Sequence, residues 1–191
     1  GKSLVTANKA MVAHHGMALA EAAAIGGGAL NFEAAVAGGI PVVKGLREGA
    51  AANAIERVSG ILNGTCNFIL TNMEKSGADF GAVLSEAQAK GYAEADPAFD
   101  IEGVDAAHKL AILAAIGFGA RIDFDSVSVT GITEVRAADI AQADALGYVI
   151  RLIAEADGPP APAPSPLGVN LPVAGSTPKI DTLSSSCREA Y

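Results

Sequence analysis

Proline placement divides the sequence into two parts that cannot fold in the same way. Seven of the nine prolines lie between Pro159 and Pro178. Dense proline removes backbone hydrogen-bond donors and favours extended, solvated chain. We therefore predict one folded domain over residues 1–157 and a proline-rich tail over residues 158–191 that has no packed core.

Residues 1–157 alternate helical and extended patterns at ordinary loop lengths. Alanine-rich or amphipathic stretches predict helices, and short β-branched stretches between turn-forming residues predict strands. The predicted helices span residues 8–24, 64–74, 80–89, 104–116 and 138–145, and the predicted strands span residues 3–6, 29–32, 55–62, 126–133 and 147–156. Together they predict an α+β or mixed α/β domain, with helices packed on one face of a single sheet.

Charge and hydropathy exclude several classes of partner. The 13 Lys and Arg residues against 21 Asp and Glu give a net charge of -8, so clustered basic residues that could neutralise phosphates are lacking. No apolar run approaches the roughly 20 residues that cross a bilayer. The first residues, GKSLVTANKA, contain no apolar signal segment. We therefore expect a cytoplasmic protein that binds neither nucleic acid nor membrane.

The strongest concentration of ionisable residues lies in GYAEADPAFDIEGVDAAHK, residues 91–109. Five carboxylates are followed there by one histidine and one lysine. The acids and the lysine are Glu94, Asp96, Asp100, Glu102, Asp105 and Lys109. On a helix, Asp105 and Lys109 would share one face. The helix dipole would favour the acids that precede it.

Two interpretations of this stretch remain open from the residues alone. It could form one compact ionisable site, or an acidic helix entry with an ordinary surface ion pair worth about 0.3–0.5 kcal/mol. A calcium-binding loop does not fit. Counted from Asp96, the third and sixth positions are Ala98 and Ile101, where a ligand and a glycine are needed.

The stretch resembles the signature of homoserine dehydrogenases. The resemblance extends to TANKA around Lys9, to NFEAAVAGGIPVVKGLREG and to ERVSGILNGTCNFIL, and it covers most of residues 3–156. It implies an NAD- or NADP-dependent oxidoreductase that interconverts homoserine and aspartate semialdehyde in the biosynthesis of threonine, methionine and isoleucine. It also implies a homodimer.

The resemblance implies roles for individual residues near the substrate. Lys109 would be the acid/base group that takes the proton of the homoserine hydroxyl. Glu94 and Asp105 would bind the substrate, because an anionic pair suits the α-ammonium group of an amino acid. Asp100 would support the same polar network.

Cofactor and cation contacts are implied in the same way. Lys9 would contact the nicotinamide end of the cofactor, and Gly91 would let the backbone approach the cofactor closely. Backbone carbonyls of a second loop would bind sodium, and the matching residues are Glu33, Val36, Gly38 and Ile40. Without the resemblance, Lys9 would be interpreted as an exposed lysine before a helix, and this loop as a simple Gly-Gly turn.

One expected feature of such an enzyme is missing from the sequence. The GxGxxG turn of a dinucleotide-binding domain is not present, because Gly26-Gly27-Gly28 follows a predicted helix instead of preceding one. We therefore expect the cofactor domain to precede Gly1, and the similarity to stop near Ala156. An alternative is a noncatalytic remnant that binds a partner subunit or an amino acid.

Three further patterns predict no site. Asn63-Gly64-Thr65 matches the glycosylation sequon, but nothing indicates secretion, so the match is attributed to chance. The three histidines, at positions 14, 15 and 108, lack metal-binding spacing. Cys66 and Cys187 fit neither a zinc site nor a disulfide framework, so Cys66 is expected to be a buried thiol.

Overall fold

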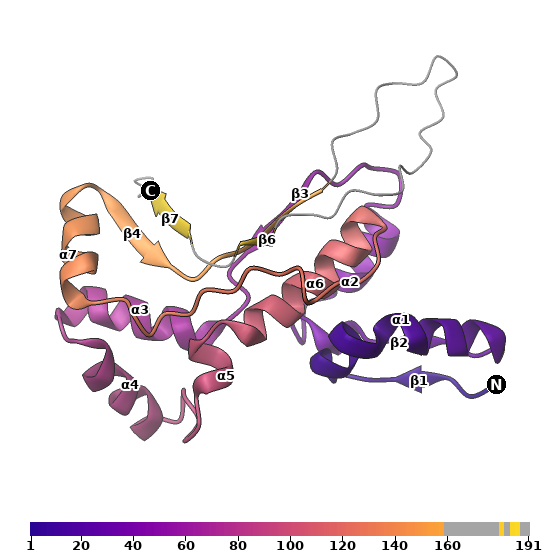
Figure 1. Ribbon diagram of the computed structural model, residues 1–191, viewed down its shortest axis with the longest axis horizontal. Helices are drawn as coiled ribbons and strands as arrows, with labels where there is room; N and C mark the ends of the chain where they lie inside the picture. Colours follow the sequence, from indigo (N-terminus) through magenta and orange to yellow (C-terminus); the bar gives the residue numbers. More distant parts are fainter. Residues whose placement is uncertain (159–179, 182–183, 188–191) are drawn as a thin grey trace, which may run out of the picture. The chain divides into compact units, whose positions relative to one another are not determined.

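The computed structural model describes residues 1–158, 180–181 and 184–187 (Figure 1). The chain divides into two compact units, each assembled from segments that are far apart in the sequence. The first unit comprises residues 1–58, 108–127 and 155–180, and the second comprises residues 59–107, 128–154 and 181–191. The range predicted as one domain, residues 1–157, is thus shared between two units.

The first unit begins with a helix packed beside two short parallel strands. Strand β1 (Leu4–Val5) pairs with β2 (Leu30–Asn31), and α1 (Lys9–Ile25) connects them (Figure 1). The Asn8 side chain accepts a hydrogen bond from Met11 N at 3.0 Å, which satisfies a free amide at the start of α1. This local signal explains why the helix begins where the sequence predicts.

Short helical turns follow β2 in the same unit. They are the 3₁₀ turn η1 (Glu33–Ala35), α2 (Val42–Lys44) and the π-helical turn η2 (Gly45–Gly49). Pro41 immediately precedes α2. Its missing N–H would have no helical partner at this position.

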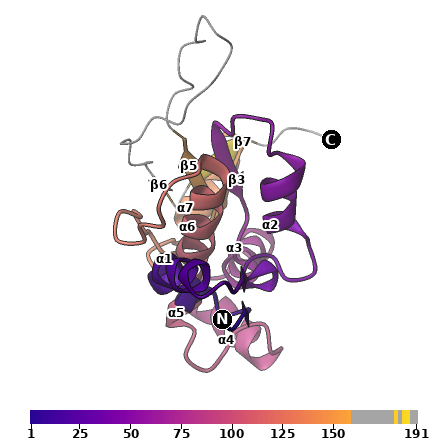
Figure 2. The same cartoon turned by 90° about the vertical axis from the view of Figure 1, so that its right-hand side faces the viewer.

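The second unit is organised around α3 (Gly64–Ser76), which contacts α4 (Phe80–Ala89), α5 (Ala98–Ile101), α7 (Ala137–Ala145) and β4 (Tyr148–Arg151). In Figures 1 and 2, α4 lies below α3. The apolar face of α3 is fully buried, and its core residues are Ile69, Leu70 and Met73. Burial of that face gives the unit its core.

The remaining strands form two further small sheets. In one, β5 (Ala154–Asp157) lies between β3 (Arg57–Gly60) and β6 (Ile180–Asp181). In the other, β4 pairs antiparallel with β7 (Ser184–Cys187). The mixed helix-and-sheet class is therefore confirmed, although the described strands form three short sheets and not one.

The tail contains two of these strands. Strands β6 and β7 lie within residues 158–191 and pair with strands of the first 157 residues. The expectation that the tail has no packed core stays a prediction. Most of the tail, including its prolines, lies outside the described residues.

Helix α6 (Val104–Phe118) is the longest after α1, and it follows the predicted span closely. Its first four residues belong to the second unit and the others to the first. Among the residues that the structure describes, no helix combines the length and the apolar character that a membrane crossing requires.

The strand predicted over residues 126–133 is wrong. These residues form turns and irregular chain. Their β-branched composition favours a strand, but Ile132 N donates to Ile101 O at 2.8 Å, so the segment packs against the end of α5. This tertiary hydrogen bond is one that a strand ladder would not contain.

The strand predicted over residues 147–156 is divided into β4 and β5. Between them, Leu152 N donates to Asn67 Oδ1, and Asn67 Nδ2 donates to Leu152 O, each at 3.0 Å. Because a side chain from α3 takes both backbone groups of Leu152, these groups are not available for strand pairing.

Candidate functional site

Two of the predicted substrate-binding acids meet in the second unit. Asp100 lies on α5, and Asp105 lies in the first turn of α6. Asn63 Nδ2 donates to Asp100 Oδ1 at 2.8 Å and to Asp105 Oδ2 at 2.9 Å. One amide group therefore joins two carboxylates from two different helices.

This carboxylate pair is largely removed from solvent. Asp105 is 4% exposed and Asn63 is 3% exposed, while Asp100 is half-buried. Carboxylates are rarely buried unless they are hydrogen-bonded or paired. A buried pair of acids favours binding of a cation, and an exposed acidic helix entry would not have this burial.

A buried thiol lies beside the pair. Cys66 Sγ donates to Asp100 O at 3.0 Å, and Cys66 is fully buried. Burial raises the pKa of the Cys66 thiol to about 12, and the negative charges of Asp100 and Asp105 act in the same direction. The expectation of a buried thiol is confirmed.

Cys66 is expected to resist alkylation by iodoacetamide at pH 8 in the folded chain and to react after unfolding. Only the thiolate reacts, and a pKa of about 12 leaves almost none of it. Peptide mapping by mass spectrometry reads Cys66 separately from Cys187. Rapid modification of Cys66 in the folded chain would contradict this arrangement.

The raised pKa of the Cys66 thiol also predicts that the stability of the fold depends on pH. An unfolded thiol ionises near its ordinary pKa of 9.0, whereas folded Cys66 keeps its proton until its pKa of about 12 is reached. The protonated Cys66 thiol therefore makes its full contribution to stability below about pH 9. That contribution is lost as the pH rises from 9 towards 12. The free energy of unfolding should fall more steeply over that range in the wild type than in Cys66→Ala.

Glu94 and Gly91 lie in the loop that follows α4. Gly91 has φ +76°, a conformation that L side chains rarely adopt, and no atom lies within 4 Å of the position that a Cβ would take there. Glu94 is exposed, and its backbone carbonyl accepts a hydrogen bond from Gln88 Nε2 at 3.0 Å. This bond holds Glu94 by its backbone, whereas Asp100 and Asp105 are held by their carboxylates.

The two predicted lysines lie on different helices. Lys109 is half-buried on α6, one helical turn after Asp105, so helix geometry places the two residues on one face. Lys9 is the half-buried first residue of α1 in the first unit. Asp100 and Asp105 thus come from α5 and α6, and Lys109 also lies on α6.

The predicted cation loop lies in the first unit. Glu33 holds α2 in place, because its carboxylate accepts from Val43 N at 3.0 Å and from Lys44 N at 2.9 Å. The carbonyl of Ile40 accepts from Val42 N at 2.8 Å. Among the turn and loop backbone hydrogen bonds of the described residues, none ends on the carbonyls of Val36 or Gly38.

Two histidines meet in the first unit, although the sequence predicts no partner for them. His14 on α1 and His108 on α6 place their Nε2 atoms 2.9 Å apart. The ring of Phe124 packs against both imidazoles. One nitrogen must donate and the other must accept, so this contact joins α1 to α6.

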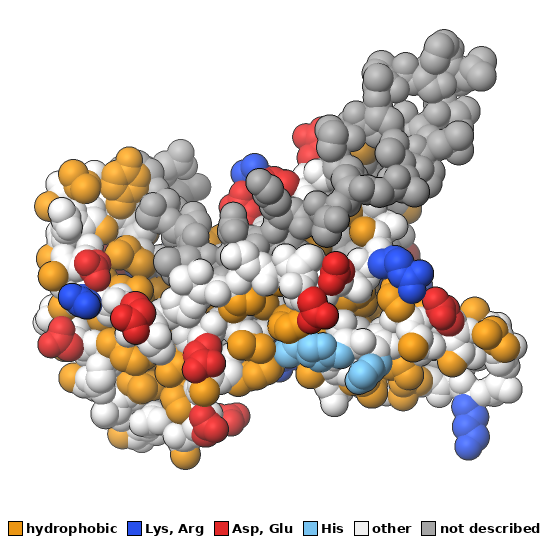
Figure 3. Space-filling view, in the orientation of Figure 1, with side chains coloured by type: hydrophobic (Ala, Val, Ile, Leu, Met, Phe, Trp, Pro, Cys, Tyr) orange, Lys and Arg blue, Asp and Glu red, His pale blue; other side chains and the backbone are white. Residues whose placement is uncertain are grey.

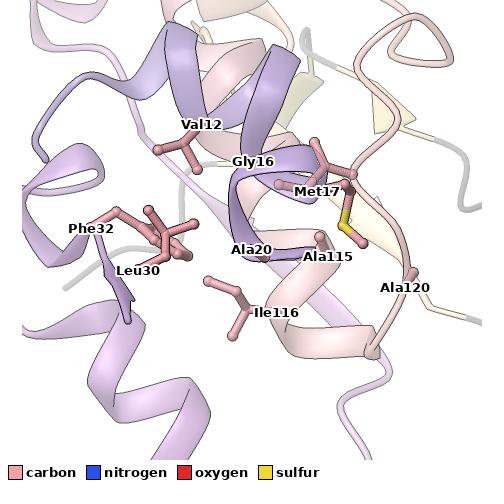
Figure 4. A pocket seen from close by; sticks show the side chains of 10 residues that line it. Val12, Gly16, Met17, Ala20, Leu30, Phe32, Ala115, Ile116 and Ala120 are labelled. Atoms are coloured by element: carbon pink, nitrogen blue, oxygen red, sulfur yellow. The ribbon is translucent and has the colours of Figure 1, made fainter. Parts of the chain in front are cut away.

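An apolar pocket of about 160 Å³ lies in the first unit between α1, β2 and α6 (Figure 4). Its lining includes Val12, Met17, Leu30, Phe32 and Ile116. None of its lining side chains is charged, so nothing there could bind the charged groups of an amino acid. On the face shown in Figure 3, acidic side chains are dispersed and do not gather in one patch.

The sequence alone did not identify Asn63 as part of the site. Its sequon was attributed to chance, and its burial confirms that it is not an exposed glycosylation acceptor. The signal that could have pointed to it is its position immediately before α3, where an asparagine caps the helix. The hydrogen bonds to Asp100 and Asp105 depend on tertiary structure.

The sequence matches known proteins over most of its length. A sequence model of the family described as homoserine dehydrogenase matches residues 41–185. The match continues past Ala156, where the similarity was expected to stop. The homoserine dehydrogenase of Pseudomonas aeruginosa is 56% identical over 151 residues, which are 79% of this chain and 35% of that protein. That of Synechocystis sp. is 53% identical over 157 residues, which are 82% of this chain and 36% of that protein.

Solved structures give the same result. A homoserine dehydrogenase from Thiobacillus denitrificans superposes with a TM-score of 0.84 and 45% identity, covering 98% of this chain and 40% of that one. A hyperthermophilic archaeal homoserine dehydrogenase in complex with NADPH superposes with a TM-score of 0.73 and 27% identity, covering 98% of this chain and 49% of that one. The chain spans about a third of the length of the curated relatives that it matches.

Proposed function

Because the chain belongs to the homoserine dehydrogenase family, we propose that it forms the substrate-binding and catalytic part of an NAD(P)-dependent homoserine dehydrogenase. Such an enzyme interconverts L-homoserine and aspartate semialdehyde. The observation that carries the proposal is the pair of buried Asp105 and half-buried Asp100, joined by one amide. The family signature places this pair next to Lys109 in the sequence.

Substrate binding follows from the charge of the pair. L-homoserine carries an α-ammonium group, and two carboxylates in a poorly solvated site attract it more strongly than they would in water. Asp105 is the more deeply buried acid, and Asp100 is half-buried. Glu94, which is exposed, is proposed to complete the substrate contacts.

Proton transfer is proposed to occur at Lys109. In its neutral form, Nζ of Lys109 accepts the proton of the substrate hydroxyl as the alcohol is oxidised, and it returns that proton when the aldehyde is reduced. The nicotinamide cofactor, when bound, supplies the hydride acceptor. The position of Lys109 on α6, one turn after Asp105, supports this role.

Cofactor and cation contacts are proposed for three regions. Lys9 and Gly91 are proposed to contact NAD or NADP, and the open space beside Gly91 is compatible with a close approach. Sodium is proposed to bind the backbone carbonyls of the loop that begins at Glu33. Oxygen ligands suit a hard cation, and the carbonyls of Val36 and Gly38 accept none of the turn and loop backbone bonds of the described residues.

A chimera tests the proposed activity. The segment of the Pseudomonas aeruginosa relative that matches this chain is replaced by the corresponding 151 residues. The chimera is expected to form NAD(P)H in the presence of L-homoserine, with the unaltered relative as the positive control. A folded chimera that binds the cofactor but gives no turnover would contradict the proposal and favour a noncatalytic binding module.

The oligomeric state and the cellular location are also proposed from the family resemblance. We expect a cytoplasmic enzyme that forms a homodimer, as the family resemblance implies. Light scattering after size-exclusion chromatography of the chimera measures the assembly directly, and a monomer at micromolar concentration would contradict it.

A further inference from the structure

Asn63 occupies a central position in the carboxylate pair although its side chain carries no charge. It is the residue before α3, and its amide lies between Asp100 and Asp105. These acids are 37 and 42 positions further along the chain. The amide therefore bridges two carboxylates that come from a distant part of the sequence.

The orientation of this amide is determined by its surroundings. Asn63 Oδ1 accepts from Cys66 N at 2.8 Å, and a backbone N–H can only donate. The oxygen must therefore face α3, and the NH₂ group must face the acids. Rotation of the amide by half a turn would break all of these hydrogen bonds, so the capping bond of α3 keeps both donors in place.

This orientation determines how the two acids are held. An NH₂ group donates two hydrogen bonds and accepts none, so the carboxylate oxygens that face it must act as acceptors. Two carboxylates from different helices are thus held beside one neutral amide.

We propose that Asn63 is a positioning residue, which holds the carboxylates of Asp100 and Asp105 in the arrangement that recognises the primary ammonium group of the substrate. The inference rests on the proposed function, because it concerns the same substrate. Asn63 acts through the two acids and does not itself exchange protons with the substrate.

Asn63→Ser tests this role in the 191-residue chain. Serine retains the ability to cap α3, but its short side chain cannot reach the two carboxylates. Asn72→Ser is the matched control, because Asn72 lies on the same helix and its amide donates to Phe68 O within that helix. Binding of L-homoserine and of γ-hydroxybutyrate, which lacks the ammonium group, is measured by isothermal titration calorimetry.

The expected result is selective. Asn63→Ser should weaken L-homoserine binding by about tenfold or more and leave the weaker binding of γ-hydroxybutyrate unchanged. Asn72→Ser should alter neither. A purely structural role would weaken both ligands together. Equal loss for the two ligands, or no loss, would overturn the inference.

A measurement on the wild-type chain covers the case in which Asn63→Ser does not fold. The side-chain NH₂ protons of Asn63 should be protected from exchange in NMR spectra and should shift when L-homoserine is added. Rapid exchange, or no response to L-homoserine, would overturn the inference. The chimera assay tests the proposed activity separately. Turnover by the chimera would support the dehydrogenase activity even if Asn63 did not position the acids.

Discussion

Lys109→Ala is expected to lower the kcat for homoserine oxidation in the chimera by about 10²–10⁴-fold, the usual contribution of a positioned acid/base group. Binding of L-homoserine should change little, because the carboxylates that attract its ammonium group remain. Steady-state formation of NAD(P)H measures kcat and KM separately. Turnover that is unchanged by the substitution would remove Lys109 from the mechanism.

Two further variants separate chemistry from charge. Lys109→Arg keeps the positive charge, but a guanidinium group does not give up its proton at accessible pH, so this variant should be as inactive as Lys109→Ala. Lys75→Ala removes an exposed lysine from the last turn of α3 and should retain full activity. An active Lys109→Arg variant would show that the lysine acts only as a charge.

Gly131→Ala is expected to lower the free energy of unfolding by about 1–3 kcal/mol, the range for overpacking a close contact. A Cβ atom at this position would lie 2.5 Å from Ile101 O and 2.6 Å from Glu102 Cα. Both neighbours are backbone atoms between α5 and α6, so they cannot move aside as a flexible side chain could. The displacement would also disturb the helices that carry Asp100 and Asp105.

Gly81→Ala is the matched control for this prediction. Gly81 lies in α4, and no atom outside that helix lies within 4 Å of the position that its Cβ would take. Alanine should therefore raise the free energy of unfolding by up to about 1 kcal/mol through its helix propensity. Denaturant titration followed by circular dichroism measures both variants. Equal stability of the two variants would contradict the close packing at Gly131.

The candidate site could be predicted only in part from the sequence. The signature from Gly91 to Lys109 contains Asp100 and Asp105, and one amide joins their carboxylates in the structure, but their role in substrate binding stays a prediction. The roles of Glu94, Lys9, Gly91 and the cation loop stay predictions. Asn63 was missed, because a residue before a helix carries the same local signal whether or not its amide also bonds distant acids.

The sequence by itself determined the longer helices and the family, but not the short helices α2 and α5. Helix α4 begins and ends at the predicted residues, and α1 begins beside its capping Asn8. Such features depend on side chains within one or two turns of each other, so they leave a local pattern.

Only the tertiary structure decided which distant groups meet. Residues 126–133 have strand composition, but their contact with Ile101 takes the place of strand pairing, and the Asn67 side chain interrupts the strand predicted at Leu152. The amide of Asn63 likewise reaches acids 37 and 42 positions away. A hydrogen bond between segments so far apart leaves no periodicity in the sequence, because its geometry exists only once both segments are packed.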